Sequence, residues 1–387
     1  MPDNAQGEQI LSYLQDQREH IFSFLERLVT AESPSSVPES QKNIQAILRE
    51  SLTALDFEVD LIQGDRTGGH ILAKQMGGDE VGEQLLIGHC DTVWPVGTLE
   101  KMPFTREDGV IKGPGVYDMK GGLTQIVFAL KAIRHLGLKA PLRPVVFVNS
   151  DEEIGSFESE PHIRQLAQQV DRVYVLEPAL GLSGMLKTAR KGVGLFTVDI
   201  AGKAAHAGLD PEKGISAIKE LSYVIQELYA LGEPDKGITV NVGIVEGGTR
   251  TNVIAPWSRA KVDVRVPTVE DAERMEPAIL NLKAHTPGVE LQIKGQIGRL
   301  PMEATEDNQR LWRMARALGK TIGLDLLYGS AGGGSDGNTT SQYVATLDGL
   351  GPVGDGAHAD HEFVFADKMI ERCALLALLI LAPNTTG

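Results

Sequence analysis

Residues 84–93 are Gln-Leu-Leu-Ile-Gly-His-Cys-Asp-Thr-Val, a short apolar run that ends in a histidine and an aspartate two positions apart. A run of this kind is typical of a buried strand. Open α/β sheets bind ligands beyond the carboxyl ends of their strands. Alternate residues of a strand point the same way, so Asp91 can hydrogen-bond the second ring nitrogen of His89 and orient it toward a metal ion. The stretch predicts an α/β fold with a site at this strand end, although such a triplet alone is more often ordinary loop chemistry.

Helices and short strands alternate around this stretch. Alternation of this kind predicts a largely parallel sheet that is covered by helices on both faces. The intervening loop 92–118 is rich in glycine and proline, and a loop this long in a compact domain is usually functional. The expected helices cover 8–30, 40–55 and 120–136, and the expected strands cover 57–62, 70–73, 84–87, 143–149 and 172–176.

The pattern changes after about residue 190 and becomes β-α-β-β-α-β, the split βαβ arrangement. The sequence Thr268-Val-Glu-Asp271 carries a capping-box pattern that predicts a helix start. From about residue 303 the first pattern returns. We therefore expect a discontinuous catalytic domain, 1–190 and 303–387, with a smaller domain, 191–302, inserted in it. The other expected strands cover 193–201, 238–245, 259–266 and 289–294, and the other expected helices cover 211–231, 307–322 and 367–381.

Length and composition limit the function. A chain of 387 residues exceeds what one core usually serves, so two domains are expected. A formal net charge of −15 argues against a nucleic-acid partner, and it requires local basic residues to capture an anionic substrate. Cys90 and Cys373 lie far apart and form no disulfide framework, which favours a reducing compartment. The polar N-terminus lacks a signal peptide, and the apolar run 374–382 is too short to cross a bilayer. These features predict a soluble, cytoplasmic protein with no membrane partner.

Acidic residues and histidines gather just beyond the expected strands or in the loops at the same edge. A mixed set of imidazoles and carboxylates suits zinc, with cobalt or manganese as alternatives. Each residue also has a simpler interpretation, since an aspartate can cap a helix and acidic pairs or histidines can form solvated turns. Their joint occurrence at strand ends favours a metal site. The candidates are His89, Asp118, Glu152, Glu153, Glu177 and His358, with His361 nearby.

Eight motifs, in order along the chain, resemble those of the M20 family of metallopeptidases and amidohydrolases. The resemblance covers about residues 20–382 and is greatest to the glutamate carboxypeptidase branch. The motifs are Gly88-His-Cys-Asp-Thr-Val93, Gly113-Pro-Gly-Val-Tyr-Asp-Met-Lys-Gly-Gly122, Asp151-Glu-Glu-Ile-Gly-Ser156, Glu177-Pro178, Gly202-Lys-Ala-Ala-His-Ala-Gly208, Thr251-Asn-Val-Ile254, Asp263-Val-Arg265 and His358-x-x-x-Glu362.

The resemblance implies a zinc-peptidase α/β/α catalytic domain, an inserted ferredoxin-like domain that serves as lid and dimerisation domain, and two zinc ions per subunit. Asp118 would bridge the ions, His89 and Glu177 would complete one, and Glu153 and His358 would complete the other. Asp91 would orient the histidine and Glu152 would be the general base. Water between two zinc ions loses a proton near neutral pH, and an acid that is not itself a ligand can take that proton and pass it to the leaving amine.

The resemblance also implies how substrate is held. His206 would reach the active site of the partner subunit in a homodimer and polarise the scissile carbonyl, and Asn252 would act in the same way. Arg265 would clamp a carboxylate with two hydrogen bonds, unless it pairs within its own sheet. Arg299 matches another basic position of this branch but could be a surface residue. Gly334 and Ser335 would offer backbone and hydroxyl groups near the amide.

One stretch departs from the glutamate carboxypeptidase branch. Arg190-Lys191-Gly192 follows the pattern of the wider family, which includes deacetylases of N-acyl amino acids, and it leaves the glutamate preference open. Cys90 should point away from the metals and serve packing. We expect a dinuclear zinc hydrolase that cleaves the amide of a peptidyl or N-acyl amino acid with a free carboxylate, as a glutamate carboxypeptidase-like exopeptidase. The alternatives are an N-acyl-amino-acid deacetylase or aminoacylase, and a non-catalytic metal-binding protein on the same fold.

Overall fold

The structure is a computed structural model, and it describes residues 2–77 and 82–384. The chain forms two compact units. The first unit consists of Met1–Thr188, Ala304–Ser330 and Ser335–Gly387, and the second consists of Ala189–Glu303 and Ala331–Gly334. The short piece Ala331–Gly334 contains most of the glycine-rich turn, so this turn belongs to the second unit.

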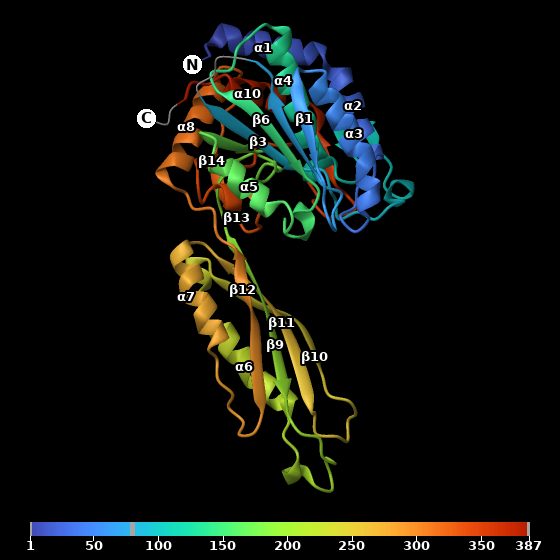
Figure 1. The fold of residues 1–387 in the computed structure, drawn as a ribbon, viewed down its shortest axis with the longest axis vertical. Coiled ribbons are helices and arrows are strands. Elements are labelled where there is room, and N and C mark those ends of the chain that lie inside the picture. The colour runs from blue at the N-terminus through green and yellow to red at the C-terminus, as the bar shows by residue number, and fades with distance from the viewer. Residues whose placement is uncertain (1, 78–81, 385–387) are drawn as a thin grey trace. The chain divides into compact units, whose positions relative to one another are not determined.

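A six-stranded mixed sheet forms the centre of the first unit (Figure 1). Four neighbouring strands, β6, β3, β7 and β14, are parallel, as expected from their helical crossovers. The remaining two strands are antiparallel, so the sheet is largely parallel, as expected, but not wholly so. No helix separates these two strands, and a short connection can only join antiparallel neighbours. The strand order is β1 (Phe57–Ile62), β2 (His70–Gln75), β6 (Arg143–Asn149), β3 (Glu83–His89), β7 (Arg172–Val175) and β14 (Thr346–Leu347).

Apolar cores cover both faces of this sheet. In β3, Leu86 belongs to the larger core, whereas Leu85 and Ile87 belong to the core on the opposite face, as the period of two requires. Burying each such side chain typically contributes about 1.5–3 kcal/mol. The helices of this unit are α1 (Asn4–Asp16), α2 (Arg18–Thr30), α3 (Gln41–Thr53), α4 (Gly121–His135), α5 (Glu160–Ala167), α8 (Glu306–Lys320), α9 (Asp336–Thr340) and α10 (Ala366–Ile380).

Two of the expected elements differ from the structure in this unit. The helix expected over 8–30 is two helices, α1 and α2, which are separated at Gln17. The apolar spacing continues across the break, so periodicity alone does not reveal it. The long loop 92–118 contains two short strands that were not expected. They form a small sheet in the order β15 (Gly354–Asp355), β16 (Phe363–Phe365), β5 (Val110–Lys112) and β4 (Thr105–Glu107).

The second unit is a four-stranded antiparallel sheet with two helices, in the β-α-β-β-α-β order (Figure 1). The strand order and connections are those of a ferredoxin-like fold, which agrees with the expected fold class. Thr268 caps α7 by accepting from the Asp271 amide, as its motif predicts. The other helix begins only after Ser216, because Pro211–Lys213 is a separate single turn. The elements are β9 (Gly192–Ala201), α6 (Ala217–Ala230), β10 (Thr239–Gly247), β11 (Trp257–Val266), α7 (Val269–Leu280) and β12 (Glu290–Arg299); β8 (Leu186–Arg190) pairs with β13 (Tyr328–Ala331) where the chain passes between the units.

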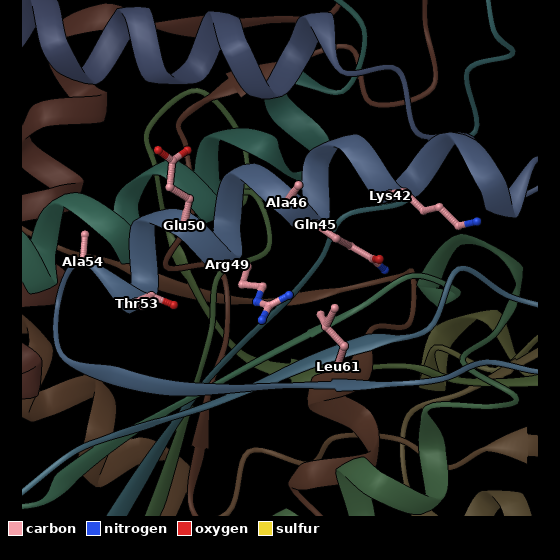
Figure 2. A pocket seen from close by; sticks show the side chains of 8 residues that line it. All are labelled: Lys42, Gln45, Ala46, Arg49, Glu50, Thr53, Ala54 and Leu61. Atoms are coloured by element: carbon pink, nitrogen blue, oxygen red, sulfur yellow. The ribbon is translucent and has the colours of Figure 1, made fainter.

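A surface groove of about 680 Å³ lies where α3 meets the edge strand β1 (Figure 2). One stripe of α3 and Leu61 of β1 line it, and none of the candidate site residues does. Across the described ranges 2–77 and 82–384, every helix is too short or too polar to cross a membrane.

Candidate metal centre

The candidate site lies where three neighbouring strands of the central sheet end. His89 is the last residue of β3, Glu152 and Glu153 begin the single turn after β6, and Glu177 follows β7 by two residues. Because these strands are parallel neighbours, their carboxyl ends bring the side chains to one edge of the sheet. The sequence pattern could predict this part of the site because each residue directly follows an apolar strand.

Two further candidates reach the same edge from loops. Asp118 lies in the turn Val116–Lys120 that leads into α4. His358 lies between the short strands β15 and β16, and its backbone has the left-handed φ of 61° that is uncommon outside glycine. Unusual backbone geometry of this type is often found where a side chain is held for a function.

Five of the six side chains form two connected groups around Asp118. The Nε2 atom of His89 lies 3.1 Å from Asp118 Oδ1 and 3.5 Å from Glu177 Oε1. The Nε2 atom of His358 lies 3.6 Å from the other oxygen of Asp118, Oδ2, and 3.0 Å from Glu153 Oε2. Asp118 therefore presents one carboxylate oxygen to each histidine.

The donor set fits divalent cations. Ligand atoms of His89, Asp118 and Glu153 lie within 4.8 Å of one another, and those of His89, Glu152 and Glu177 do so too. Glu153 Oε1 is buried without a hydrogen-bond partner. Four carboxylates this close together repel one another, and two divalent cations would neutralise them. Imidazole and carboxylate ligands suit zinc and related transition metals.

Asp91 supports the site through more contacts than the sequence predicts. The Nδ1 atom of His89 lies 3.0 Å from the Asp91 backbone oxygen and 3.4 Å from its Oδ1 atom, so the proton on Nδ1 leaves Nε2 available as a ligand. The Asp91 carboxylate also accepts hydrogen bonds from the backbone amides of Glu152 and Glu153, at 3.2 and 3.1 Å. It therefore orients the acidic pair as well as the histidine.

Ser35 is a site residue that the sequence did not indicate. Its hydroxyl donates to Asp91 Oδ2 at 2.7 Å, and both side chains are buried. Ser35 lies 56 positions from its partner in an ordinary Ser-Pro-Ser-Ser turn, so no pattern in one sequence points to it.

The charges of the cluster shift the pKa values of both histidines. Burial works to lower the pKa of His89, but its hydrogen bonds with Asp118, Asp91 and Glu177 raise that pKa well above its usual value. The hydrogen bond with Glu153 raises the pKa of His358 to about 9. Without a competing metal ion, both imidazoles hold a proton at neutral pH.

We predict that metal uptake by the metal-free protein becomes tighter as the pH rises. A metal ion binds only the neutral imidazole, so below a pKa of about 9 the ion held by His358 must displace a proton from this side chain. Chelator-competition titrations from mildly acidic to mildly alkaline pH measure this dependence. The His358→Gln variant should bind metal more weakly and with a flatter pH dependence. An affinity of the unchanged protein that does not vary with pH would contradict the prediction.

The second unit carries a histidine whose ring is held by the backbone. His206 Nδ1 accepts hydrogen bonds from the amides of Gly208 and Leu209, both at 3.1 Å. With Nδ1 occupied as an acceptor, the neutral ring carries its proton on Nε2. Nε2 of His206 can therefore donate a hydrogen bond. Asn252 accepts a hydrogen bond from the Ala207 amide through its backbone oxygen.

Arginines surround the glycine-rich turn of the second unit. Arg265 forms a two-point ion pair with Asp263, with both nitrogen–oxygen distances at 2.8 Å, and its Nη1 atom points to the Gly332 oxygen at 3.5 Å. Arg190 is buried and donates to the oxygens of Gly333 and Gly334 at 3.1 Å. The Arg299 side chain lies against Gly334, at 2.9 Å from the position that a Cβ atom would take. These contacts hold the turn in one conformation.

The candidate Ser335 is bonded inside the first unit, and Cys90 of the same unit was expected to serve packing. Ser335 is fully buried, and its hydroxyl donates to Asp348 at 2.6 Å while it accepts from the Gly337 amide as the cap of α9. Its hydroxyl is therefore already engaged within the protein. Cys90 is fully buried in the large core, and burial raises the pKa of its thiol to about 12.

This fold and site define a metal-dependent hydrolase. Residues 85–382 match the peptidase family M20/M25/M40, and the chain belongs to this family. Carboxypeptidase G2 from Pseudomonas sp. (strain RS-16) is 30% identical over 384 residues, which cover 95% of this chain and 90% of that protein. Succinyl-diaminopimelate desuccinylase from Dechloromonas aromatica (strain RCB) is 26% identical over 361 residues, with 88% and 93% covered.

Solved structures support the fold assignment. A tripeptidase from Staphylococcus aureus subsp. aureus mu50 aligns with a TM-score of 0.79 and 21% identity, over 94% of this chain and 97% of that chain. A dinuclear metal binding peptidase of the M20 family from Bacillus subtilis aligns with a TM-score of 0.66 and 15% identity, over 95% and 98%. The expected family, α/β fold and hydrolase class are thus confirmed.

Proposed function

We propose that the protein is a dinuclear metal hydrolase, with zinc as the metal, that cleaves the amide of a peptidyl or N-acyl amino acid with a free carboxylate. The observation that carries this proposal is the position of Asp118 between two histidine–carboxylate groups. His89 and Glu177 would hold one ion with Asp118, and Glu153 and His358 would hold the other. When bound, the ion pair supplies Lewis-acid chemistry that polarises the amide and makes water acidic enough to attack at neutral pH.

Glu152 is the proposed general base of the reaction. It takes a proton from the attacking water and later delivers it to the leaving amine. A separate acid beside the ligands supports catalysis over metal storage, because pure binding needs no such group. Asp91 holds the backbone amides of Glu152 and Glu153, so it keeps the base and its neighbouring ligand in fixed positions relative to each other.

Substrate recognition is proposed to come from the second unit. Arg265 is the candidate cation for the substrate carboxylate. Its Nε and Nη2 atoms already pair with Asp263 of the same strand, which is the alternative that the sequence left open, so a two-point clamp on the substrate would have to replace this pair. Arg299 and Gly334 lie together at the same turn and are the further candidates. Asn252 would act with His206. The hydroxyl of Ser335, which belongs to the first unit, is the weakest candidate, since it is buried and bonded to Asp348.

The released amino acid separates the carboxypeptidase from the deacetylase interpretation. Similarity to carboxypeptidase G2 over nearly the whole chain supports a glutamate carboxypeptidase-like activity. The sequence at Arg190 departs from that branch. Its side chain donates hydrogen bonds to the backbone oxygens of Gly333 and Gly334 and therefore shapes the glycine-rich turn. We accordingly place the carboxypeptidase activity first and the deacetylase activity second.

We predict that chelation abolishes hydrolysis and that added zinc restores it. The assay uses a panel of N-acetyl amino acids and peptidyl or N-acyl glutamates, with free amine as the readout and metal content measured in parallel. Preferred release of glutamate supports the first activity, and preferred cleavage of acetyl groups supports the second. Full activity of the metal-free protein would refute the proposal.

We further propose a homodimer in which His206 polarises the substrate carbonyl at the partner's active site. The proton on its Nε2 atom supports this role, because a carbonyl oxygen needs a donor. Removing one such donor typically costs roughly 100- to 1,000-fold in kcat.

Mixing two inactive variants tests whether the site is shared between subunits. We predict that His206→Ala and Glu152→Ala chains recover part of the activity when they are unfolded and refolded together, because a mixed dimer restores one complete site. Each variant refolded alone is the control. Recovery no greater than in these controls would show that His206 acts within its own chain or has no part in the reaction.

A further inference from the structure

The carboxylate of Glu362 collects four hydrogen bonds at the back of the candidate metal centre. Its Oε1 atom accepts from the backbone amides of Tyr117 and Asp118, at 2.8 and 3.0 Å. Its Oε2 atom accepts from the Gly115 amide and from the indole nitrogen of Trp94, both at 2.8 Å. Glu362 is fully buried, so no solvent competes for these bonds.

Three of these donors belong to the segment 115–118, which presents Asp118. Two of the amides flank or belong to Asp118 itself, so the carboxylate of Glu362 fixes the backbone from which the Asp118 side chain projects. This contact joins positions 244 apart in the sequence. It also connects the two ends of the site, because His358 lies only four residues before Glu362 and β16 begins directly after it.

Only a carboxylate satisfies this arrangement of donors. Each oxygen faces two N–H groups, and a carboxylate offers acceptors on both sides. A glutamine has the same shape, but either orientation of its amide turns an NH₂ group toward two donors. Buried donors left without an acceptor are costly, so the segment 115–118 would shift to find other partners.

We propose that Glu362 is a positioning residue that sets Asp118 between the two metal ions. The proposal rests on the proposed role of Asp118 as the ligand shared by both ions. Residues that orient metal ligands through hydrogen bonds typically change metal affinity by roughly 10- to 100-fold when they are replaced. Because the shared ligand is the one affected, the binding of both ions should weaken.

The test compares Glu362→Gln with a matched variant of the same loop. Glu32 also accepts two backbone amides of the loop 92–118, from Gly97 at 2.8 Å and Leu99 at 3.1 Å, but this part of the loop carries no candidate ligand. Metal affinity is measured by chelator competition, and stoichiometry is measured by elemental analysis. The melting temperature of each metal-free variant reports on the fold.

We expect Glu362→Gln to bind both ions roughly 10- to 100-fold more weakly, and Glu32→Gln to bind them as the unchanged protein does. Trp94→Phe removes one of the four donors and should weaken binding less; it also provides the test if Glu362→Gln does not fold. Unchanged metal affinity in Glu362→Gln would overturn the proposal, as would unchanged affinity in Trp94→Phe where that variant is the test. Equal losses of metal affinity in Glu362→Gln and Glu32→Gln would overturn it too. If the unchanged protein binds no pair of ions, the proposed function itself fails, and this outcome is visible before any variant is compared.

Discussion

Replacing Glu152 with glutamine should lower kcat roughly 100- to 10,000-fold while the protein keeps both metal ions. Glutamine preserves the size of the side chain and its place in the turn after β6, but it cannot accept a proton from water. KM should change little, because the substrate contacts lie elsewhere in the proposed site. Steady-state kinetics and metal analysis of the same preparation measure both quantities.

The neighbouring acid provides the matched control for this prediction. Glu153→Gln changes the same chemical group one position away, and it should reduce the metal content because Glu153 pairs with His358 at 3.0 Å. Glu152 also lies within 4.8 Å of ligand atoms of His89 and Glu177, so a ligand role is the competing interpretation. If Glu152→Gln loses an ion and Glu153→Gln retains both, then Glu152 is the metal ligand and Glu153 is the general base.

The position of the site was predictable because the ligands follow strands. His89, Glu153 and Glu177 each come shortly after an apolar run, and parallel strands end at one edge of a sheet. The sequence therefore indicated which residues would meet, and the structure brings them together. Asp118 and His358 were candidates from the residues as well, although each lies in a loop, and the individual metal-binding roles of all five residues came from resemblance to a family.

Residues that support the site could not be predicted in the same way. Ser35 and Glu362 make long-range contacts: Ser35 bonds to Asp91, and Glu362 accepts three backbone amides of the segment 115–118. Such contacts leave no periodic pattern, and a serine in a turn or an acid before a strand has many ordinary uses. Arg190 is a related case, because its two carbonyl partners lie more than 140 positions away.

The short strands of the long loop were missed for another physical reason. Strands β4 and β5 have three residues each, and their burial pattern shows only one fully buried side chain. Pairing with β16, rather than local propensity, holds this small sheet together. It also places Glu362, directly before β16, against the segment that follows β5.

Replacing Asp118 with alanine should remove both metal ions and reduce activity at least as far as the loss of Glu152 does. Asp118 Oδ1 lies 3.1 Å from His89 and Oδ2 lies 3.6 Å from His358, so one substitution removes an oxygen from each group. Two cations held by the remaining groups would then repel each other without the negative charge of a shared carboxylate. Elemental analysis and chelator competition measure the two affinities.

Single-ion variants distinguish a shared ligand from an ordinary one. Glu177→Ala removes a carboxylate that lies 3.5 Å from His89, so it should weaken the ion proposed for that group and leave the other bound. Glu153→Ala should do the reverse, because Glu153 Oε2 lies 3.0 Å from His358 Nε2. If Asp118 is shared, its substitution should weaken the binding of both ions. Retention of one ion at unchanged affinity in Asp118→Ala would show that the two groups bind metal independently, and that Asp118 serves only one of them.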